Sequence, residues 1–151
     1  MKPEQKAPKS TNKMVDLCLG IAMKAHAGQA DLDGNPVILH PLTVGLAGKT
    51  PEEQCAGFLH DVVEDTPYTF DDLLGMGVSP EIVEALRLLT HDENEPYLDY
   101  VRRIAGSGNE IAIAVKLNDL RHNLERGRKM GYKRLVDKHE AAMAIFDSMA
   151  Q

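Results

Sequence analysis

The sequence of 151 residues has no tryptophan, few aromatic residues and only two cysteines. Because aromatic side chains are scarce, leucine, isoleucine, valine, alanine and methionine must fill the interior. Cys18 and Cys55 stand in apolar stretches with helical spacing, so two buried free thiols are expected in place of a disulfide or a metal-binding pair. The chain also lacks a signal-like opening segment and any apolar run long enough to cross a membrane. A cytoplasmic location is therefore the default expectation.

Basic residues are scarce through most of the chain. Residues 14–120 carry six basic and eighteen acidic side chains, a net charge of −12, whereas residues 1–13 and residues 121–151 carry +3 each. Nucleic-acid binding requires a basic face, so we expect neither a nucleic acid nor a membrane as a partner. An acidic middle suits a domain that holds a cation, although acidic side chains can also serve solubility alone.

Apolar residues recur at helical spacing along most of the chain, and the alternation typical of strands is not found. Residues 1–10, rich in lysine, proline and polar groups, are predicted to be a flexible tail ahead of one domain over residues 11–151. Capping residues followed by proline mark several helix starts. The helices are predicted at about 12–26, 41–48, 51–66, 69–75, 80–89, 96–105, 109–125 and 132–149. The expected fold class is all-α, a single helical bundle.

The run from His60 to Thr66 reads His-Asp-Val-Val-Glu-Asp-Thr and places an imidazole and three carboxylates within a few residues of one another. At ~100° per residue, its imidazole and three carboxylates share one arc of a helical wheel, opposite an apolar arc. An adjacent His and Asp can bind one divalent metal, and acids one turn later can handle protons or water beside it. A solvated amphipathic helix would show the same pattern, so other segments must decide.

Two other segments favour a metal site. His40 precedes Pro41, where it could also be a capping histidine ahead of a helix. Asp119 is an acid within an apolar helical stretch, where burial is costly unless the carboxylate is paired or binds a metal. These two residues complete a His₂Asp₂ set with His60 and Asp61. Mixed nitrogen and oxygen ligands suit Mn²⁺, Fe²⁺ or Zn²⁺ better than Ca²⁺ or Mg²⁺.

Several short motifs follow one another in a fixed order along the chain. They are His26-Ala27-Gly28-Gln29, Gly34-Asn35-Pro36, His40-Pro41, Phe58-Leu59-His60-Asp61-Val62-Val63-Glu64-Asp65-Thr66, Leu89-Thr90, Lys116-Leu117-Asn118-Asp119 and His122-Asn123. By this ordered set the chain resembles the HD-domain phosphohydrolases. Within them it resembles the hydrolase domain of RelA/SpoT proteins and the stand-alone small alarmone hydrolases. The resemblance implies a single HD-domain helical bundle.

The resemblance also implies site residues and a reaction. It assigns a divalent ion, commonly manganese, to four ligands, namely His40, His60, Asp61 and Asp119. Glu64 and Asp65 match the Glu-Asp pair implicated in catalysis, and Asn123 matches an asparagine near the nucleotide. Members of the family remove the 3′-pyrophosphate from guanosine tetra- or pentaphosphate, so the expected substrate is this alarmone or a close purine analogue.

One loop departs from the family pattern. Asp31 and Leu32 stand where the family usually has an Arg-Lys pair, and Val37 stands where it has Tyr. The family's arginine is associated with packing on the guanine base, an interaction that an acid cannot copy. Lys116 and Arg102 are candidate compensating cations for the substrate, as are Arg103, Arg121 and Arg126. A surface or helix-end charge is the alternative for each of these cations.

Because this loop differs from the family pattern, two other functions remain as alternatives. One is a different HD-type nucleotide phosphohydrolase, and the other is a catalytically weak alarmone-binding regulatory domain. The expected partner is in every case a small-molecule nucleotide. A homo-oligomer is left open by the sequence.

Overall fold

The computed structural model describes residues 12–150 as a bundle of helices. Their bounds are α1 Lys13–Ala25, α2 Leu39–Leu46, α3 Pro51–Leu59, α4 Val62–Asp65, α5 Phe70–Gly75, α6 Pro80–Leu89, α7 Tyr97–Ala105, α8 Glu110–Met130 and α9 Lys133–Met149. Strand pairing within the described residues is limited to an isolated bridge between Ala30 and Pro36. The predicted all-α class is confirmed. The predicted tail, residues 1–10, lies outside the described residues, as do residues 11 and 151.

Local capping signals correctly predicted where helices begin. The side chain of Asn12 accepts hydrogen bonds from two backbone N–H groups at the start of α1. Thr50 and Ser79 each cap a helix whose first residue is proline. Thr69 forms a reciprocal capping box with Asp72 at the start of α5. These contacts satisfy N–H groups that have no partner within the helix.

The predicted boundaries were wrong at three places. Helix α2 begins at Leu39, so His40 lies inside the helix and does not precede it. The helix expected to carry the whole His-Asp-Val-Val-Glu-Asp run ends at Leu59, and a turn separates it from α4. Helix α8 continues to Met130 and ends at Gly131, whose φ of 73° is the left-handed conformation that glycine adopts readily.

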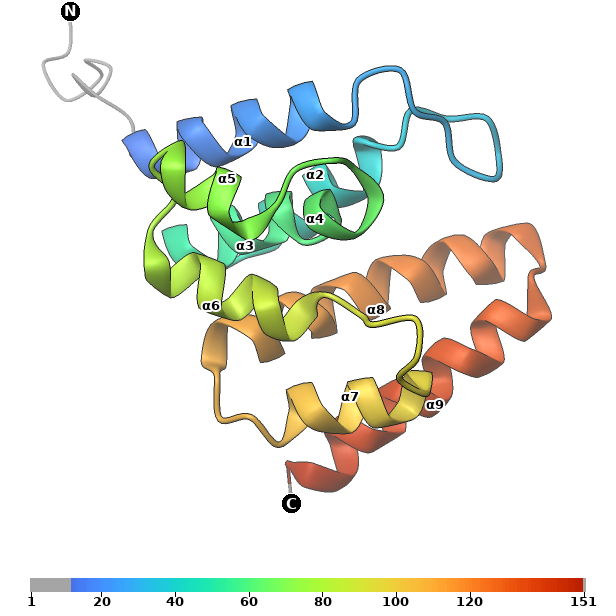
Figure 1. The fold of residues 1–151 in the computed structure, drawn as a ribbon. Coiled ribbons are helices and arrows are strands. Elements are labelled where there is room, and N and C mark those ends of the chain that lie inside the picture. Colours follow the sequence, from blue (N-terminus) through green and yellow to red (C-terminus); the bar gives the residue numbers. More distant parts are fainter. Residues whose placement is uncertain (1–11, 151) are drawn as a thin grey trace, which may run out of the picture.

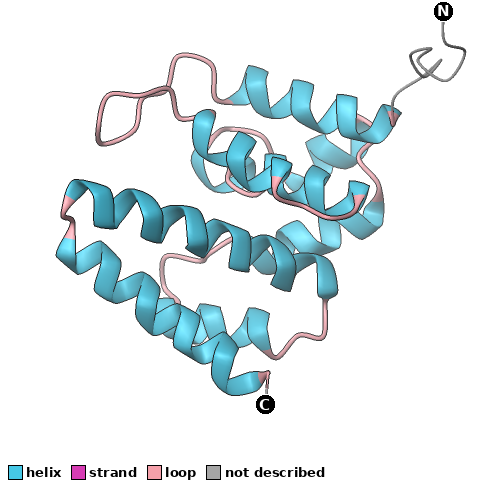
Figure 2. Cartoon of the chain, turned by 180° about the vertical axis from the view of Figure 1, so that it is seen from behind, coloured by secondary structure: helices cyan, strands magenta, loops and turns pink. Residues whose placement is uncertain are grey.

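The helices are arranged around α8 (Figure 1). Helices α1 to α5 lie on one side and α7 and α9 lie on the other, while α6 lies beside α8 and also packs against α3, α5 and α7. Figure 2 shows α8 and α9 from behind as an antiparallel pair joined by a short turn. Helix α8 packs against α2, α3, α6, α7 and α9, so it is the central helix of the bundle over the described residues. All helices over residues 12–150 are too short or too polar to cross a bilayer.

Helices α2 and α3 approach closely because glycines face each other across their contact. A Cβ atom on Gly57 would lie only 2.7 Å from the Cα of Gly45, and a Cβ on Gly45 would overlap the ring of Phe58. The backbones can therefore approach to a distance that larger residues would prevent. This contact sets the spacing between His40 on α2 and His60 just after α3.

Both cysteines are free and fully buried, as predicted.

Candidate metal centre

Side chains from three segments converge where α2, α3 and α8 meet. The Nε2 of His40 donates a hydrogen bond to Asp119 Oδ1, 2.7 Å away, and the Nε2 of His60 lies 3.4 Å from the same oxygen. Asp61 Oδ2 lies 3.2 Å from His60 Nε2. Potential ligand atoms of His40, His60 and Asp119 lie within 4.8 Å of one another, and all three residues are buried. The structure therefore brings three of the four predicted ligands into one buried group and places the fourth, Asp61, beside His60.

One ring nitrogen of His60 has a hydrogen-bond partner and the other has none among the described residues. Its Nδ1 donates to the carbonyl oxygen of Gly57 at 2.7 Å, which gives the neutral imidazole a lone pair on Nε2. That Nε2 is buried and has no hydrogen-bond partner among the described residues, although two carboxylates lie beside it. A cation between them would satisfy the lone pair and both carboxylates together. The donor set therefore fits a divalent metal.

The charges that surround His60 also favour a positive charge at this position. Burial works against a charged His60, but the carboxylates of Asp61 and Asp119 outweigh it and raise the pKa of His60 to about 9. The metal-free imidazole is therefore protonated at pH 7, and a divalent cation bound in the same acidic surroundings would displace that proton from Nε2.

Asp119 is held by groups on its own helix. Lys116 Nζ donates to Asp119 Oδ2 at 2.9 Å, and Asn123 Nδ2 donates to Oδ1 at 3.1 Å. Burial opposes the charges on Lys116 and Asp119, but their attraction raises the pKa of Lys116 and lowers that of Asp119. The ammonium of Lys116 also lies over the rings of Tyr97 and Tyr100. One carboxylate oxygen is thus bound to lysine, while the other faces the imidazoles.

Glu64 and Asp65 lie on α4, directly after the His-Asp turn. Their carboxylates and that of Asp61 lie within 4.8 Å of one another, in a group separate from the buried cluster. Burial is the main cause that raises the pKa of each. Glu64 Oε1 accepts a hydrogen bond from the backbone N–H of His91 at 2.7 Å, which orients its carboxylate.

A cavity of about 290 Å³ opens beside the cluster. The four predicted ligands line it, as do Glu64, Lys116 and Asn123. Arg126, one of the candidate substrate cations, also lines it. The side chains that line it without having been predicted as site residues are Leu89, His91, Tyr97, Tyr100, Lys138 and His139. Several of these come from α7 and α9, whose sequences carry no motif, so only packing reveals them.

Two histidines that were not predicted as site residues lie close to this cavity. His122 was in a recognised motif, and its Nδ1 lies 2.7 Å from His40 Nδ1 with the rings stacked. His139 has a buried Nδ1 without a hydrogen-bond partner among the described residues. Burial lowers the pKa of both to about 4, so both imidazoles are neutral at pH 7.

The structure separates the two predicted substrate cations. Lys116 lines the cavity, whereas Arg102 is exposed on α7, forms an ion pair with Asp99 and lines none of the described cavities. The neighbouring Arg103 binds Glu95 through two hydrogen bonds. A substrate contact by Arg102 stays a prediction without support from its position.

The chain is similar in sequence to parts of enzymes of alarmone metabolism. No family model matches it. The bifunctional (p)ppGpp synthase/hydrolase SpoT of Escherichia coli K12 is 36% identical over 117 residues, which cover 69% of this chain and 16% of that protein. A guanosine-3′,5′-bis(diphosphate) 3′-pyrophosphohydrolase of Spiroplasma citri is 35% identical over 129 residues, 77% of this chain and 17% of the relative. A GTP pyrophosphokinase of Streptomyces antibioticus is 28% identical over 158 residues, 97% of this chain and 19% of the relative.

The chain thus spans less than a fifth of the length of these curated relatives. A solved structure described as a metazoan ortholog of SpoT that hydrolyzes ppGpp superposes with a TM-score of 0.67. That match covers 94% of this chain and 96% of the other at 20% identity, so it shows a common fold. With the fold, the converging histidines and aspartates, and these relatives together, the chain is an HD-type, RelA/SpoT hydrolase-like protein.

Proposed function

We propose that this chain hydrolyses the 3′-pyrophosphate of guanosine tetra- or pentaphosphate, or of a close purine analogue, as a metal-dependent phosphohydrolase. The observation that carries the proposal is the buried Nε2 of His60, which lacks a hydrogen-bond partner among the described residues and lies beside two carboxylates. The names of the relatives supply the reaction. A cytoplasmic location belongs to the same proposal.

The ion would be held by His40, His60, Asp61 and Asp119, and Mn²⁺ is our proposed metal because the ligands mix imidazole and carboxylate. A divalent ion bound there supplies Lewis acidity toward a phosphoryl oxygen and toward water. Lys116 neutralises part of the negative charge on Asp119, which is 2.9 Å away.

The remaining roles follow from position. Glu64 and Asp65 are proposed to orient the attacking water or take its proton, because their carboxylates adjoin Asp61 and burial raises the pKa of each. Asn123 is proposed as a nucleotide contact, because it lines the cavity while its amide binds Asp119. The positive charge of Lys138 at the cavity wall adds attraction for phosphate.

The test is to incubate the purified chain with Mn²⁺ and guanosine 5′-diphosphate 3′-diphosphate, and to measure released pyrophosphate and orthophosphate separately. We expect pyrophosphate release that stops with chelator and returns with Mn²⁺. His60→Ala and Asp61→Ala should lack turnover, whereas Lys133→Ala, at an exposed position on α9, should keep it. Equal release by the wild type and His60→Ala would overturn the proposal.

The acid at Asp31 favours a second candidate, a regulatory domain that binds the alarmone with little turnover. Asp31 replaces the arginine that the family resemblance associates with the base. Alarmone binding measured by calorimetry without pyrophosphate release would support this candidate. Release of orthophosphate from other nucleotides would instead indicate a different HD-type phosphohydrolase.

A further inference from the structure

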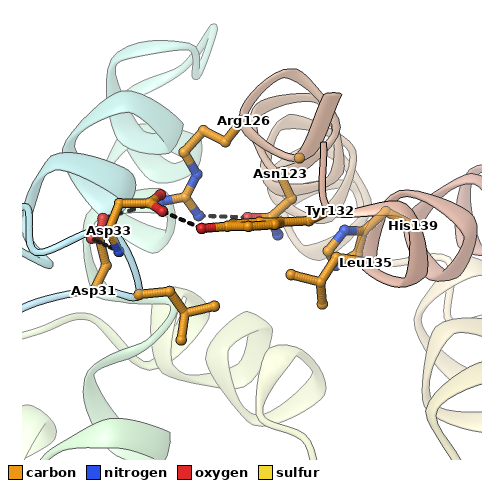
Figure 3. Close-up of a pocket in the computed structure, with 9 residues that line it drawn as sticks. Asp31, Asp33, Asn123, Arg126, Tyr132, Leu135 and His139 are labelled. Atoms are coloured by element: carbon orange, nitrogen blue, oxygen red, sulfur yellow. Dashed lines mark hydrogen bonds and ion pairs between the residues drawn. The ribbon is translucent and has the colours of Figure 1, made fainter. Parts of the chain in front are cut away.

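Figure 3 shows a second cavity, which has a volume of about 100 Å³. Asn123, Arg126 and His139 line both this cavity and the one beside the metal cluster, so the two cavities adjoin each other. Asp31 and Asp33 approach from the loop between α1 and α2, and Tyr132 approaches from the turn between α8 and α9. The loop that departs from the family pattern therefore forms one wall of this space.

Asp31 presents one free carboxylate oxygen to the cavity. Its Oδ1 accepts hydrogen bonds from the backbone N–H groups of Asp33 and Asn35, both at 2.9 Å, which fixes the loop in a turn. Its Oδ2 lies 3.8 Å from Arg126 Nη1, too far for a hydrogen bond. This oxygen is thus held in place and remains available to accept from a ligand.

Arg126 is connected to the metal cluster along α8. Its Nη2 donates to Asn123 Oδ1 at 2.7 Å, and Asn123 in turn donates to Asp119. From Asp119 to Arg126 the helix rises by about 10 Å, at 1.5 Å per residue. A nucleotide with its 3′-phosphates at the cluster would reach this second cavity with its base.

The two charged groups complement guanine and not adenine. Guanine offers the donors N1–H and N2–H₂ on one edge, and the acceptors O6 and N7 on another. The free carboxylate oxygen can accept from these donors, and a guanidinium donates to the two acceptors. Adenine has an acceptor at N1 and a donor at N6, so it would lose the contact with the carboxylate and would keep only the N7 contact with the guanidinium. The ring of Tyr132 and the side chain of Leu135 offer apolar surface for the face of a base.

We propose that this second cavity is the nucleobase subsite, in which the Asp31 carboxylate and the Arg126 guanidinium select guanine over adenine. The inference rests on the proposed function, because it names the base-recognising residues of the same site. The guanidinium comes from α8, and the acid in the loop recognises the base directly. The absence of the family's Arg-Lys pair would then change which residues bind guanine, and the selectivity for guanine would be kept.

The test measures binding and turnover separately. Binding of GDP, IDP and ADP, which carry no 3′-pyrophosphate, is measured by calorimetry with Mn²⁺ present. We expect GDP to bind most tightly, IDP more weakly because it lacks the 2-amino group, and ADP most weakly. A bidentate base contact corresponds to about 5- to 150-fold in affinity, so the GDP-to-ADP ratio should fall in this range.

The variant Asp31→Asn keeps an oxygen for the loop turn but replaces the free carboxylate oxygen with an amide. It should lower the GDP-to-IDP and GDP-to-ADP ratios toward one without changing the melting temperature. Arg126→Lys, which keeps the charge but loses the paired donors, should also lower the GDP-to-ADP ratio. Asp92→Asn is the matched control, because Asp92 accepts from Asn94 N–H in a similar turn away from both cavities.

Pyrophosphate release from the guanosine and adenosine tetraphosphates is then measured with the same proteins. Equal binding of GDP and ADP by the wild type, or unchanged ratios in both variants, would overturn the base subsite even if turnover is normal. Selective GDP binding without pyrophosphate release would support the subsite and overturn the proposed hydrolysis. Pyrophosphate release that is selective for the guanosine tetraphosphate in the wild type, and that loses this selectivity in Asp31→Asn, would support both the base subsite and the proposed hydrolysis.

Discussion

The side chain of His60 donates a hydrogen bond from Nδ1 to the carbonyl oxygen of Gly57, one helical turn earlier and 2.7 Å away. Because Gly57 lies within α3, the direction of its carbonyl group is fixed, and the hydrogen bond fixes the direction of the imidazole as well. Nε2 consequently faces the carboxylates of Asp61 and Asp119 before any ion binds. Such orientation of a ligand by an outer hydrogen bond is common at metal sites.

Replacing His60 by alanine should greatly weaken metal binding. Loss of an outer partner alone typically costs roughly 10- to 100-fold in metal affinity, and loss of a ligand should cost at least about 100-fold. Isothermal calorimetry with Mn²⁺ measures the effect. Asp99→Asn, at an exposed acid on α7, serves as the control and should bind Mn²⁺ like the wild type. Equal affinities for the wild type and His60→Ala would remove this imidazole from the ligand set.

Metal should stabilise the folded chain, because its ligands come together only in the native state. At a free Mn²⁺ concentration one hundred times the dissociation constant, the free energy of unfolding should rise by about 2.7 kcal/mol. Thermal unfolding followed by circular dichroism, with Mn²⁺ or with chelator, tests this. The increase should vanish in Asp119→Asn. An unchanged melting temperature across a thousandfold range of Mn²⁺ would argue against a site in this cluster.

Replacing Lys116 by methionine should destabilise the metal-free protein. Lys116 and Asp119 are almost fully buried, and removing one partner of such a pair costs about 3–5 kcal/mol because the other charge is left uncompensated. Urea denaturation in chelator measures the loss. The control is Lys133→Met, which removes an exposed, solvent-screened pair with Asp137 and should therefore change stability little. Mn²⁺ should restore part of the stability of Lys116→Met, since the ion also compensates Asp119. A loss equal to that of the control would contradict the prediction.

Replacing Gly57 by alanine should separate α2 from α3. The added methyl group would lie 2.7 Å from the Cα of Gly45, and overpacking of this kind typically costs about 1–3 kcal/mol. Because His40 and His60 lie on either side of this contact, Mn²⁺ affinity should fall as well. Gly20→Ala, at an exposed position on α1 with open space around it, should instead stabilise the helix by about 0.5–1 kcal/mol. Unfolding free energies and Mn²⁺ affinities of the two variants test the prediction, and similar values for both would disprove it.

The parts of the fold that depend on neighbouring residues could be predicted from the sequence. Thr50 and Ser79 cap helices through hydrogen bonds to an N–H three residues later, and a following proline marks each start. The hydrogen bonds that join Lys116 and Asn123 to Asp119 likewise follow from their spacing of three and four residues along one helix.

The parts that depend on packing could not be predicted. The helical wheel assumed a continuous helix through His60, whereas the helix ends at Leu59 and a turn directs His60 toward α2 and α8. The burial of Lys116 depends on tyrosines of α7 that are distant in sequence. His139 faces the cavity only because α9 packs on α7 and α8, and its own surroundings in the sequence give no such signal.

Helix α8 carries Asp119 toward the metal cluster and Arg126 toward the second cavity, the proposed nucleobase subsite. The separation of these two side chains is fixed by the geometry of an uninterrupted helix, so it does not depend on the loops around them. Substitutions at the far end of α8, or in the loop that carries Asp31, can therefore alter which nucleotide is accepted while the ion-binding end keeps its arrangement. Substrate preference and hydrolytic chemistry can in this way diverge independently within one bundle.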